Sequence, residues 1–167
     1  MKMKAVRYYA PNDIRYEEVK IPELNEGEIL VKVQAALTCG TDVKTFRRGH
    51  PVLIKKVPSG FGHEFSGTIE KLGENVTNFN VGDRVVCANS APCGECFHCR
   101  KGEYELCENL ALLNGAYAQY IVVPRRIVEK NTLIIPKNLT FAQAAFSEPL
   151  SNVCHGIAKT PIQKGDT

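Results

Sequence analysis

The segment that decides the fold is GHEFSGTIEKLGENV, residues 62–76. Its middle part, residues 65–72, predicts a β-strand, and Gly73-Glu74-Asn75 is a turn signal that ends the strand. His63 and Glu64 stand immediately before the strand, and imidazole and carboxylate groups are both zinc ligands. A lone histidine, however, is more often a hydrogen-bonded core or surface residue, so the segment alone leaves its chemistry open.

Similar runs occupy most of the first two-thirds of the chain, separated by turn signals such as Pro11-Asn12-Asp13. In one run Ile29, Val31 and Val33 recur at every second position, which is typical of a half-buried strand. Many short strands with regular turns favour a sandwich or a barrel. The expected strands are residues 4–9, 14–20, 28–36, 65–72, 84–88 and 117–123.

The last third of the chain changes character and predicts helix. Thr140 is followed three residues later by Gln143, a capping-box signal before an Ala-rich run. We expect a helix over residues 141–146, interrupted near Pro149 and resuming toward Lys159.

The composition indicates one soluble domain, since 167 residues suffice for a hydrophobic core and 23% of them are charged. Lys and Arg number 21 against 18 Asp and Glu, a bias too weak to favour nucleic acid or a membrane surface as a partner. The chain has no apolar run of 18 residues, and its N-terminus lacks the apolar region of a signal peptide. The sequence therefore predicts a cytoplasmic protein.

Seven cysteines are unusual for a protein of a reducing compartment, where cysteines are more often metal ligands than disulfides. Four of them form the pattern C-x2-C-x2-C-x7-C at Cys93, Cys96, Cys99 and Cys107. Zinc takes four ligands at tetrahedral corners, with Zn–S distances of about 2.3 Å, and a tight loop such as residues 90–110 can supply them. The polar, turn-rich sequence has little apolar core of its own, and a metal would replace that core.

The alternatives for this cluster are free thiols, disulfides and an iron–sulfur cluster. Its spacing differs from the cysteine runs of ferredoxins, and disulfides conflict with the expected compartment. Four thiolates complete the zinc shell, so His98 inside the cluster is expected to be a bystander. The loop is therefore predicted to be a structural zinc lobe.

A second metal site is possible around Cys39, which follows a predicted strand. A catalytic zinc takes three protein ligands of mixed N, S and O type and keeps one position open. Cys39, His63 and one carboxylate supply that set, and the carboxylate could be Glu64 or Glu148. Read without a metal, Glu148 would be a carboxylate at the start of a helix.

Residues 62–76 fit the pattern G-H-E-x2-G-x5-G-x2-V, which resembles the signature of zinc-containing alcohol dehydrogenases of the medium-chain dehydrogenase/reductase superfamily. The segments Cys39-Gly40-Thr41-Asp42 and Gly82-Asp83-Arg84-Val85 and the four-cysteine lobe are found in that family's order, so the resemblance covers essentially the whole chain. The pair Glu148-Pro149 resembles the corresponding segment of the polyol (sorbitol or iditol) and threonine dehydrogenase branch, whereas classical alcohol dehydrogenases carry a cysteine there.

The resemblance implies a mainly β fold, a GroES-like partly open β-barrel with short helices and a zinc-binding lobe, and two zinc ions per chain. It makes Cys39 and His63 ligands of the catalytic zinc, with Glu64 as third ligand in some states. It implies that Glu148 ligates this zinc or contacts its water.

The resemblance implies two further residue roles, and the sequence departs from the family pattern at two positions. Asp42 matches the residue that orients the zinc-binding histidine, and Thr41 matches the hydroxyl that relays the substrate proton. Lys44 stands where many members carry a relay histidine, and Gly40 stands where some carry an arginine that touches the cofactor pyrophosphate.

Relatives of this family continue into a nucleotide-binding domain with a G-x-G-x-x-G fingerprint. Here Gly60-Phe61-Gly62 begins such a pattern, but Phe65 occupies its last glycine position and a strand follows instead of a helix. Residues 164–167 are similar to the segment that precedes the nucleotide-binding domain. Residues 1–167 are therefore expected to be the catalytic domain of a longer, homo-oligomeric enzyme that uses NAD or NADP, and to be inactive alone.

The expected activity of that enzyme is the reversible oxidation of a small alcohol or polyol, with zinc as the Lewis acid. An L-threonine 3-dehydrogenase-like enzyme is an alternative within the same branch. A zinc-stabilised binding module without activity would need a broken ligand set, whereas Cys39, His63 and Glu64 are all present. The zinc-free quinone reductases share the fold, but Cys39 and the cysteine lobe argue against them.

Overall fold

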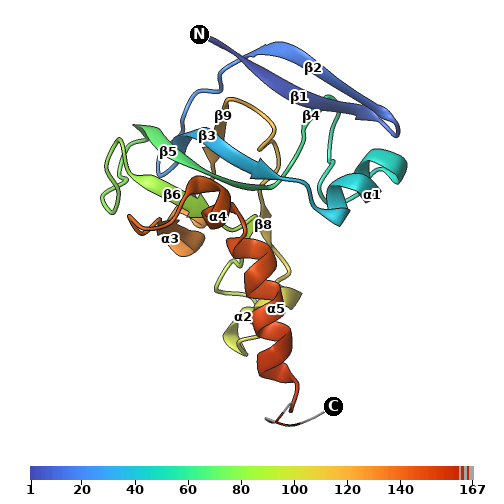
Figure 1. The fold of residues 1–167 in the computed structure, drawn as a ribbon, viewed down its shortest axis with the longest axis vertical. Coiled ribbons are helices and arrows are strands. Elements are labelled where there is room, and N and C mark those ends of the chain that lie inside the picture. Colours follow the sequence, from blue (N-terminus) through green and yellow to red (C-terminus); the bar gives the residue numbers. More distant parts are fainter. Residues whose placement is uncertain (162, 164, 166–167) are drawn as a thin grey trace.

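The structure, a computed structural model, describes residues 1–161, 163 and 165. Its strands are β1 (Lys2–Ala10), β2 (Asp13–Lys20), β3 (Ile29–Leu37), β4 (Ser59–Gly60), β5 (Glu64–Leu72), β6 (Arg84–Cys87), β7 (Ser90–Ala91), β8 (Ala111–Leu112), β9 (Tyr120–Val123) and β10 (Thr132–Ile134). They form a three-stranded sheet in the order β2-β1-β4, a five-stranded sheet in the order β10-β6-β5-β3-β9, and the pair β7-β8. The sheets are open, and the predicted mainly β, partly open barrel is confirmed (Figure 1).

All six expected strands are present, with boundaries shifted by up to three residues. The largest shift is at residues 117–123, where β9 begins only at Tyr120. Tyr117 cannot join the ladder because its backbone N–H donates to Phe61 O and its carbonyl accepts from Val6 N. The four strands that were not predicted, β4, β7, β8 and β10, have two or three residues each, too few to show a period.

The main core lies on the five-stranded sheet, where β3 and β5 are central neighbours. Ile29, Val31, Phe65 and Ile69 are almost completely buried there. Leu30 is buried as well, so the start of β3 is covered on both faces and not only on the predicted one. This pairing matters for function because it places the end of β3 against the start of β5, with Leu37 opposite Glu64.

The helices are α1 (Gly40–Arg48), α2 (Phe97–Arg100), the 3-10 turn η1 (Tyr104–Leu106), α3 (Arg125–Asn131), α4 (Phe141–Ala145) and α5 (Ser147–Lys159). The capping box of Thr140 and Gln143 is confirmed. The predicted interruption of the helix is present, but it falls at Phe146 and not near Pro149, which lies in the first turn of α5. A proline is tolerated there because the N–H groups of a first turn have no helical partner.

The β1-β2 ribbon lies at one end of the long axis of the molecule, and α5 extends away from the sheets at the other end (Figure 1). None of the residues of α5 is buried. Among the described residues, no helix has the length and apolarity needed to cross a membrane. Most of residues 164–167, expected to precede a further domain, lie outside the described part of the chain.

Candidate metal centres

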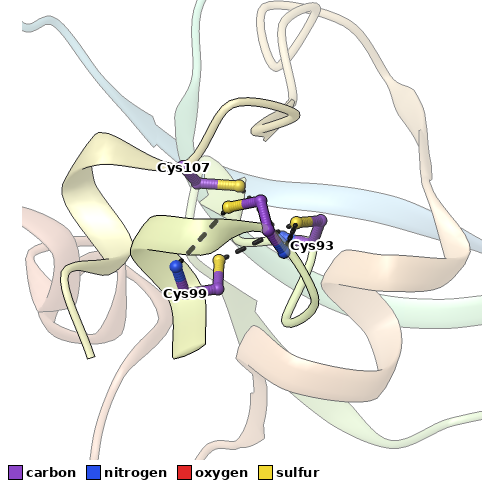
Figure 2. Close-up of side chains that lie close together, drawn as sticks. Cys93, Cys99 and Cys107 are labelled. Atoms are coloured by element: carbon purple, nitrogen blue, oxygen red, sulfur yellow. Dashed lines mark hydrogen bonds between the residues drawn. The ribbon is translucent and has the colours of Figure 1, made fainter. Parts of the chain in front are cut away.

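The four predicted cysteines lie together in the loop between β7 and β8. Their sulfur atoms all lie within 4.8 Å of one another, and those of Cys93, Cys99 and Cys107 are close neighbours in Figure 2. Cys93 Sγ and Cys99 Sγ are 3.8 Å apart, well beyond the roughly 2.05 Å of a disulfide bond. The loop thus gathers four free thiols around one point, as a tetrahedral zinc site requires.

Backbone N–H groups of the same loop point at these sulfur atoms. The N–H of Cys93 donates to Cys107 Sγ at 3.1 Å, and that of Cys96 donates to Cys93 Sγ at 3.4 Å. Hydrogen bonds from the backbone of Glu95 and Cys96 lower the pKa of Cys93 to about 6. Burial instead raises the pKa of Cys99 to about 12, because its charged form lacks solvent. The thiols therefore cannot all ionise together unless a cation such as zinc compensates their charge.

The second predicted site is assembled by the pairing of β3 with β5. Cys39 is the N-cap of α1, directly after β3, and His63 and Glu64 stand at the start of β5. One ligand atom from each lies within 4.8 Å of the others. His63 and Glu64 are buried and Cys39 is half-buried. This donor set of one sulfur, one nitrogen and one oxygen matches that of a catalytic zinc with an open position.

Asp42 is hydrogen-bonded to two residues of this site, Cys39 and His63. Its Oδ1 lies 3.0 Å from Nδ1 of His63, so Nε2 is the ring nitrogen left for a metal. Burial by itself would raise the pKa of Asp42, but hydrogen bonds from His63, from the Cys39 N–H and from Tyr117 lower it. The hydrogen bond to Asp42 in turn raises the pKa of His63 to about 9. A buried ion pair therefore fixes the histidine ring, and metal binding would displace the proton on Nε2.

The two candidate carboxylates, Glu64 and Glu148, are neighbours, but they come from different elements and have different surroundings. Burial, followed by the nearby charge of Glu148, raises the pKa of Glu64, while contact with Cys39 lowers it. Glu148 approaches from the first turn of α5 and does not belong to the group of three ligand atoms. Its Oε1 accepts hydrogen bonds from Nδ2 of Asn152 at 2.9 Å and of Asn89 at 3.3 Å. Glu64 is therefore better placed as a ligand in this geometry, whereas Glu148 lies outside the ligand group.

The remaining predicted positions lie at the start of α1. Thr41 is half-buried, and its N–H donates to Cys39 Sγ at 3.4 Å. Gly40 is exposed, with no atom within 4 Å of the place where a Cβ would stand. Lys44 is exposed to solvent. In the lobe, His98 is paired with Glu103 at 2.8 Å and not with the sulfur cluster.

Sequence reasoning missed one residue of the site, Tyr117. Its hydroxyl lies 2.8 Å from Asp42 Oδ2, although the two residues are 75 positions apart in the sequence. Helix α1 was missed too, although Cys39 and Asp42 form a capping box at its start. The spacing of Cys39 and Asp42 was a usable signal for α1, whereas nothing local marks Tyr117.

Comparison with known proteins independently supports the resemblance to zinc-containing alcohol dehydrogenases. The model of the alcohol dehydrogenase GroES-like domain matches residues 25–136. The sorbitol dehydrogenase of Bacillus subtilis (strain 168) is 35% identical to this chain and covers 99% of it. The L-threonine 3-dehydrogenase of Bacillus velezensis is 38% identical over 86% of the chain. The chain spans about half the length of these relatives, 47% and 42% respectively.

Solved structures agree with this similarity. A protein of Sinorhizobium meliloti 1021, assigned as a zinc-binding dehydrogenase and bound to NADP, matches all of the chain with a TM-score of 0.87 and 34% identity, over 48% of its own length. The 2R,3R-butanediol dehydrogenase of Bacillus subtilis matches 99% of the chain with a TM-score of 0.84 and 29% identity, over 49% of its own length.

Proposed function

Because this chain belongs to the family of alcohol dehydrogenase GroES-like domains, we propose that it is the catalytic domain of a zinc-dependent, NAD- or NADP-linked alcohol or polyol dehydrogenase. The observation that carries the proposal is the meeting of Cys39, His63 and Glu64 around one point. We further propose that the four-cysteine lobe holds a second, structural zinc.

The donor set fits a zinc ion on chemical grounds. Asp42, His63 and Glu64 are ionisable groups with at most 4% of their surface exposed, which is costly unless the charges are paired or bind a metal. Asp42 and His63 form a pair, but burial and the neighbouring Glu148 disfavour a charge on Glu64.

A zinc ion held here would lower the pKa of a substrate hydroxyl as a Lewis acid. The protein's own residues orient that chemistry. Asp42 fixes the ring of His63, and Thr41, two residues after Cys39, offers the hydroxyl that we propose takes the substrate proton. Lys44 lies exposed on the same helix at the position of the relay histidine, so no imidazole is present there to pass the proton on to solvent.

The nicotinamide that accepts the hydride would be held by a nucleotide-binding domain elsewhere in a longer protein. Supporting this proposal, the chain spans about half the length of relatives such as the sorbitol dehydrogenase. Phe146, Leu150, Val153 and Ile157 form an exposed apolar stripe at helical spacing, which a further domain could cover. The relatives leave both a polyol and L-threonine as substrate candidates.

Metal analysis tests the central proposal. The chain purified without chelator should contain two zinc ions, and Cys39→Ser should reduce the content to one while the fold persists. Cys154→Ser is the matched control, because Cys154 is an exposed cysteine outside both ligand groups. A wild-type content of one zinc or less, with metal supplied, would exclude the proposed pair of sites.

A further inference from the structure

We propose that Tyr117 is a positioning residue for the metal site and acts through Asp42 on both Cys39 and His63. The inference rests on the proposed function, because it concerns the metal that those two residues would hold. It adds a contact from a distant part of the chain, just before β9, that no ligand motif contains.

The contact itself is a hydrogen bond in a partly buried setting. Tyr117 Oη lies 2.8 Å from Asp42 Oδ2 and 2.9 Å from the carbonyl oxygen of Leu37. One hydroxyl has a single proton, and a carboxylate is the stronger acceptor. Burial raises the pKa of Tyr117, and hydrogen bonding to Asp42 raises it further, so the group remains a donor at any physiological pH.

The same carboxylate is tied to two of the three candidate ligands. Asp42 Oδ2 accepts the N–H of Cys39 at 2.9 Å, and Oδ1 faces Nδ1 of His63 at 3.0 Å. Rotation of the carboxylate would therefore disturb the N-cap that presents the Cys39 sulfur and the ring that presents Nε2. The hydroxyl of Tyr117 opposes such rotation because it bonds the oxygen that His63 does not use.

The ring of Tyr117 is held by the residues immediately before His63. It packs edge-on against Phe61 with the ring centroids 5.7 Å apart, and its N–H donates to Phe61 O at 2.9 Å. Gly62 has a φ of +85°, and a Cβ at this position would overlap the Tyr117 ring. The segment that carries His63 is thus shaped around Tyr117, so the hydroxyl has a defined position relative to the ligand.

A purely structural role for the Tyr117 hydroxyl predicts a different experimental result. The hydroxyl would then only satisfy a buried carboxylate, and its loss would destabilise the fold without changing metal retention. The positioning role instead predicts a change confined to the metal site at Cys39 and His63. Residues that orient metal ligands in this way typically contribute a factor of roughly 10 to 100 in metal affinity.

The test is Tyr117→Phe, which keeps the ring against Phe61 and removes only the hydroxyl. Zinc release into a chromophoric chelator should be about 10-fold faster or more from the Cys39 site, identified by its absence in Cys39→Ser. Release from the lobe should be unchanged, which also shows that the variant is folded. The matched control is Tyr9→Phe, because the Tyr9 hydroxyl bonds a carboxylate of Glu17 at 3.0 Å and neither residue belongs to a ligand group.

Cobalt substitution gives a readout that a structural role would not move. The visible absorption of Co²⁺ at the Cys39 site should change in Tyr117→Phe and stay the same in Tyr9→Phe. When Tyr117→Phe is added to Asp42→Asn, it should change the cobalt spectrum little further, because Tyr117 acts through the carboxylate of Asp42.

Unchanged release and an unchanged cobalt spectrum in Tyr117→Phe, with wild-type zinc still present at the Cys39 site, would overturn this inference alone. An effect in Asp42→Asn without one in Tyr117→Phe would do the same. Absence of zinc from the Cys39 site of the wild type would instead overturn the proposed function together with the inference.

Discussion

At the scale of single residues, Asp42 organises the candidate catalytic site. Its carboxylate is 4% exposed and lies opposite three donors, which are the Cys39 N–H, the Tyr117 hydroxyl and the His63 ring. Hydrogen bonds to the charged form offset the cost of burial, so the group remains ionised. A single anion can therefore orient two candidate metal ligands from different elements.

Mutation of Glu148 should show whether its carboxylate assists the metal at the Cys39 site. In Glu148→Gln the shape and an oxygen acceptor for Asn152 remain, but the charge beside Glu64 is lost. If Glu148 assists the metal or its water, zinc should be released from the Cys39 site roughly 10-fold faster. Chelator-competition kinetics would measure this.

Glu129→Gln is the control for that experiment, since Glu129 is a helical carboxylate that bonds Arg125 at 2.6 Å on the surface. If both variants release zinc at the wild-type rate, and turnover of the complete enzyme is also unchanged, Glu148 serves only as a carboxylate in the first turn of α5.

At the scale of elements, the register between β3 and β5 sets the geometry of the site. Leu37 lies opposite Glu64, which brings Cys39 at the N-cap of α1 close to the first residues of β5. A slip of one residue would turn Glu64 to the other face of the sheet. Gly67 secures the register, because a side chain there would overlap the backbone of Lys32 on the neighbouring strand.

The lobe between β7 and β8 is predicted to depend on its own metal. Cys96→Ser should lose the lobe zinc and keep the one at Cys39, because the two ligand groups share no residue. The zinc content should fall from two to one, and residues 92–108 should become sensitive to protease. Cys154→Ser should change neither property. A folded Cys96→Ser variant that lost both metals would show that the sites are coupled.

At the scale of the whole molecule, the described residues contain two candidate metal sites and no glycine loop built to cradle a pyrophosphate. Gly60 is the last residue of β4 and Gly62 stands two residues before β5, and a Cβ at these positions would meet Gly115 and Tyr117 respectively. Helix N-termini bind phosphate through free N–H groups and an open approach, and this segment leads into a strand.

A polypeptide of these 167 residues should therefore bind NADH with a dissociation constant weaker than about 1 mM, equivalent to less than ~4 kcal/mol. It should not oxidise alcohols, because hydride transfer requires the nicotinamide to be held beside the substrate carbon. Fluorescence titration with NADH and an assay on polyols, secondary alcohols and L-threonine would check both. Tight binding or clear turnover would place a cofactor site within this part of the protein.

The features that the amino-acid sequence determined by itself are those whose signals are local. Cysteines separated by two, two and seven intervening residues define the lobe, because a short loop can bring them around one atom whatever the rest of the chain does. The expected strands came from alternating side chains and turn residues, and helix α4 from the capping box at Thr140. The exact ends of the strands, and the strands of two or three residues, were not predicted, because they depend on which neighbouring strands are available for pairing.

The tertiary structure alone decided how distant segments meet. The sequence proposed Cys39, His63 and either glutamate as one site, but the pairing of β3 with β5 places Glu64 in the group of ligand atoms, and Glu148 lies outside it on α5. The link from Tyr117 to Asp42 spans 75 residues and has no local signature. Such contacts depend on strand order and register, and these are set by the burial of a shared core and not by any single stretch of sequence.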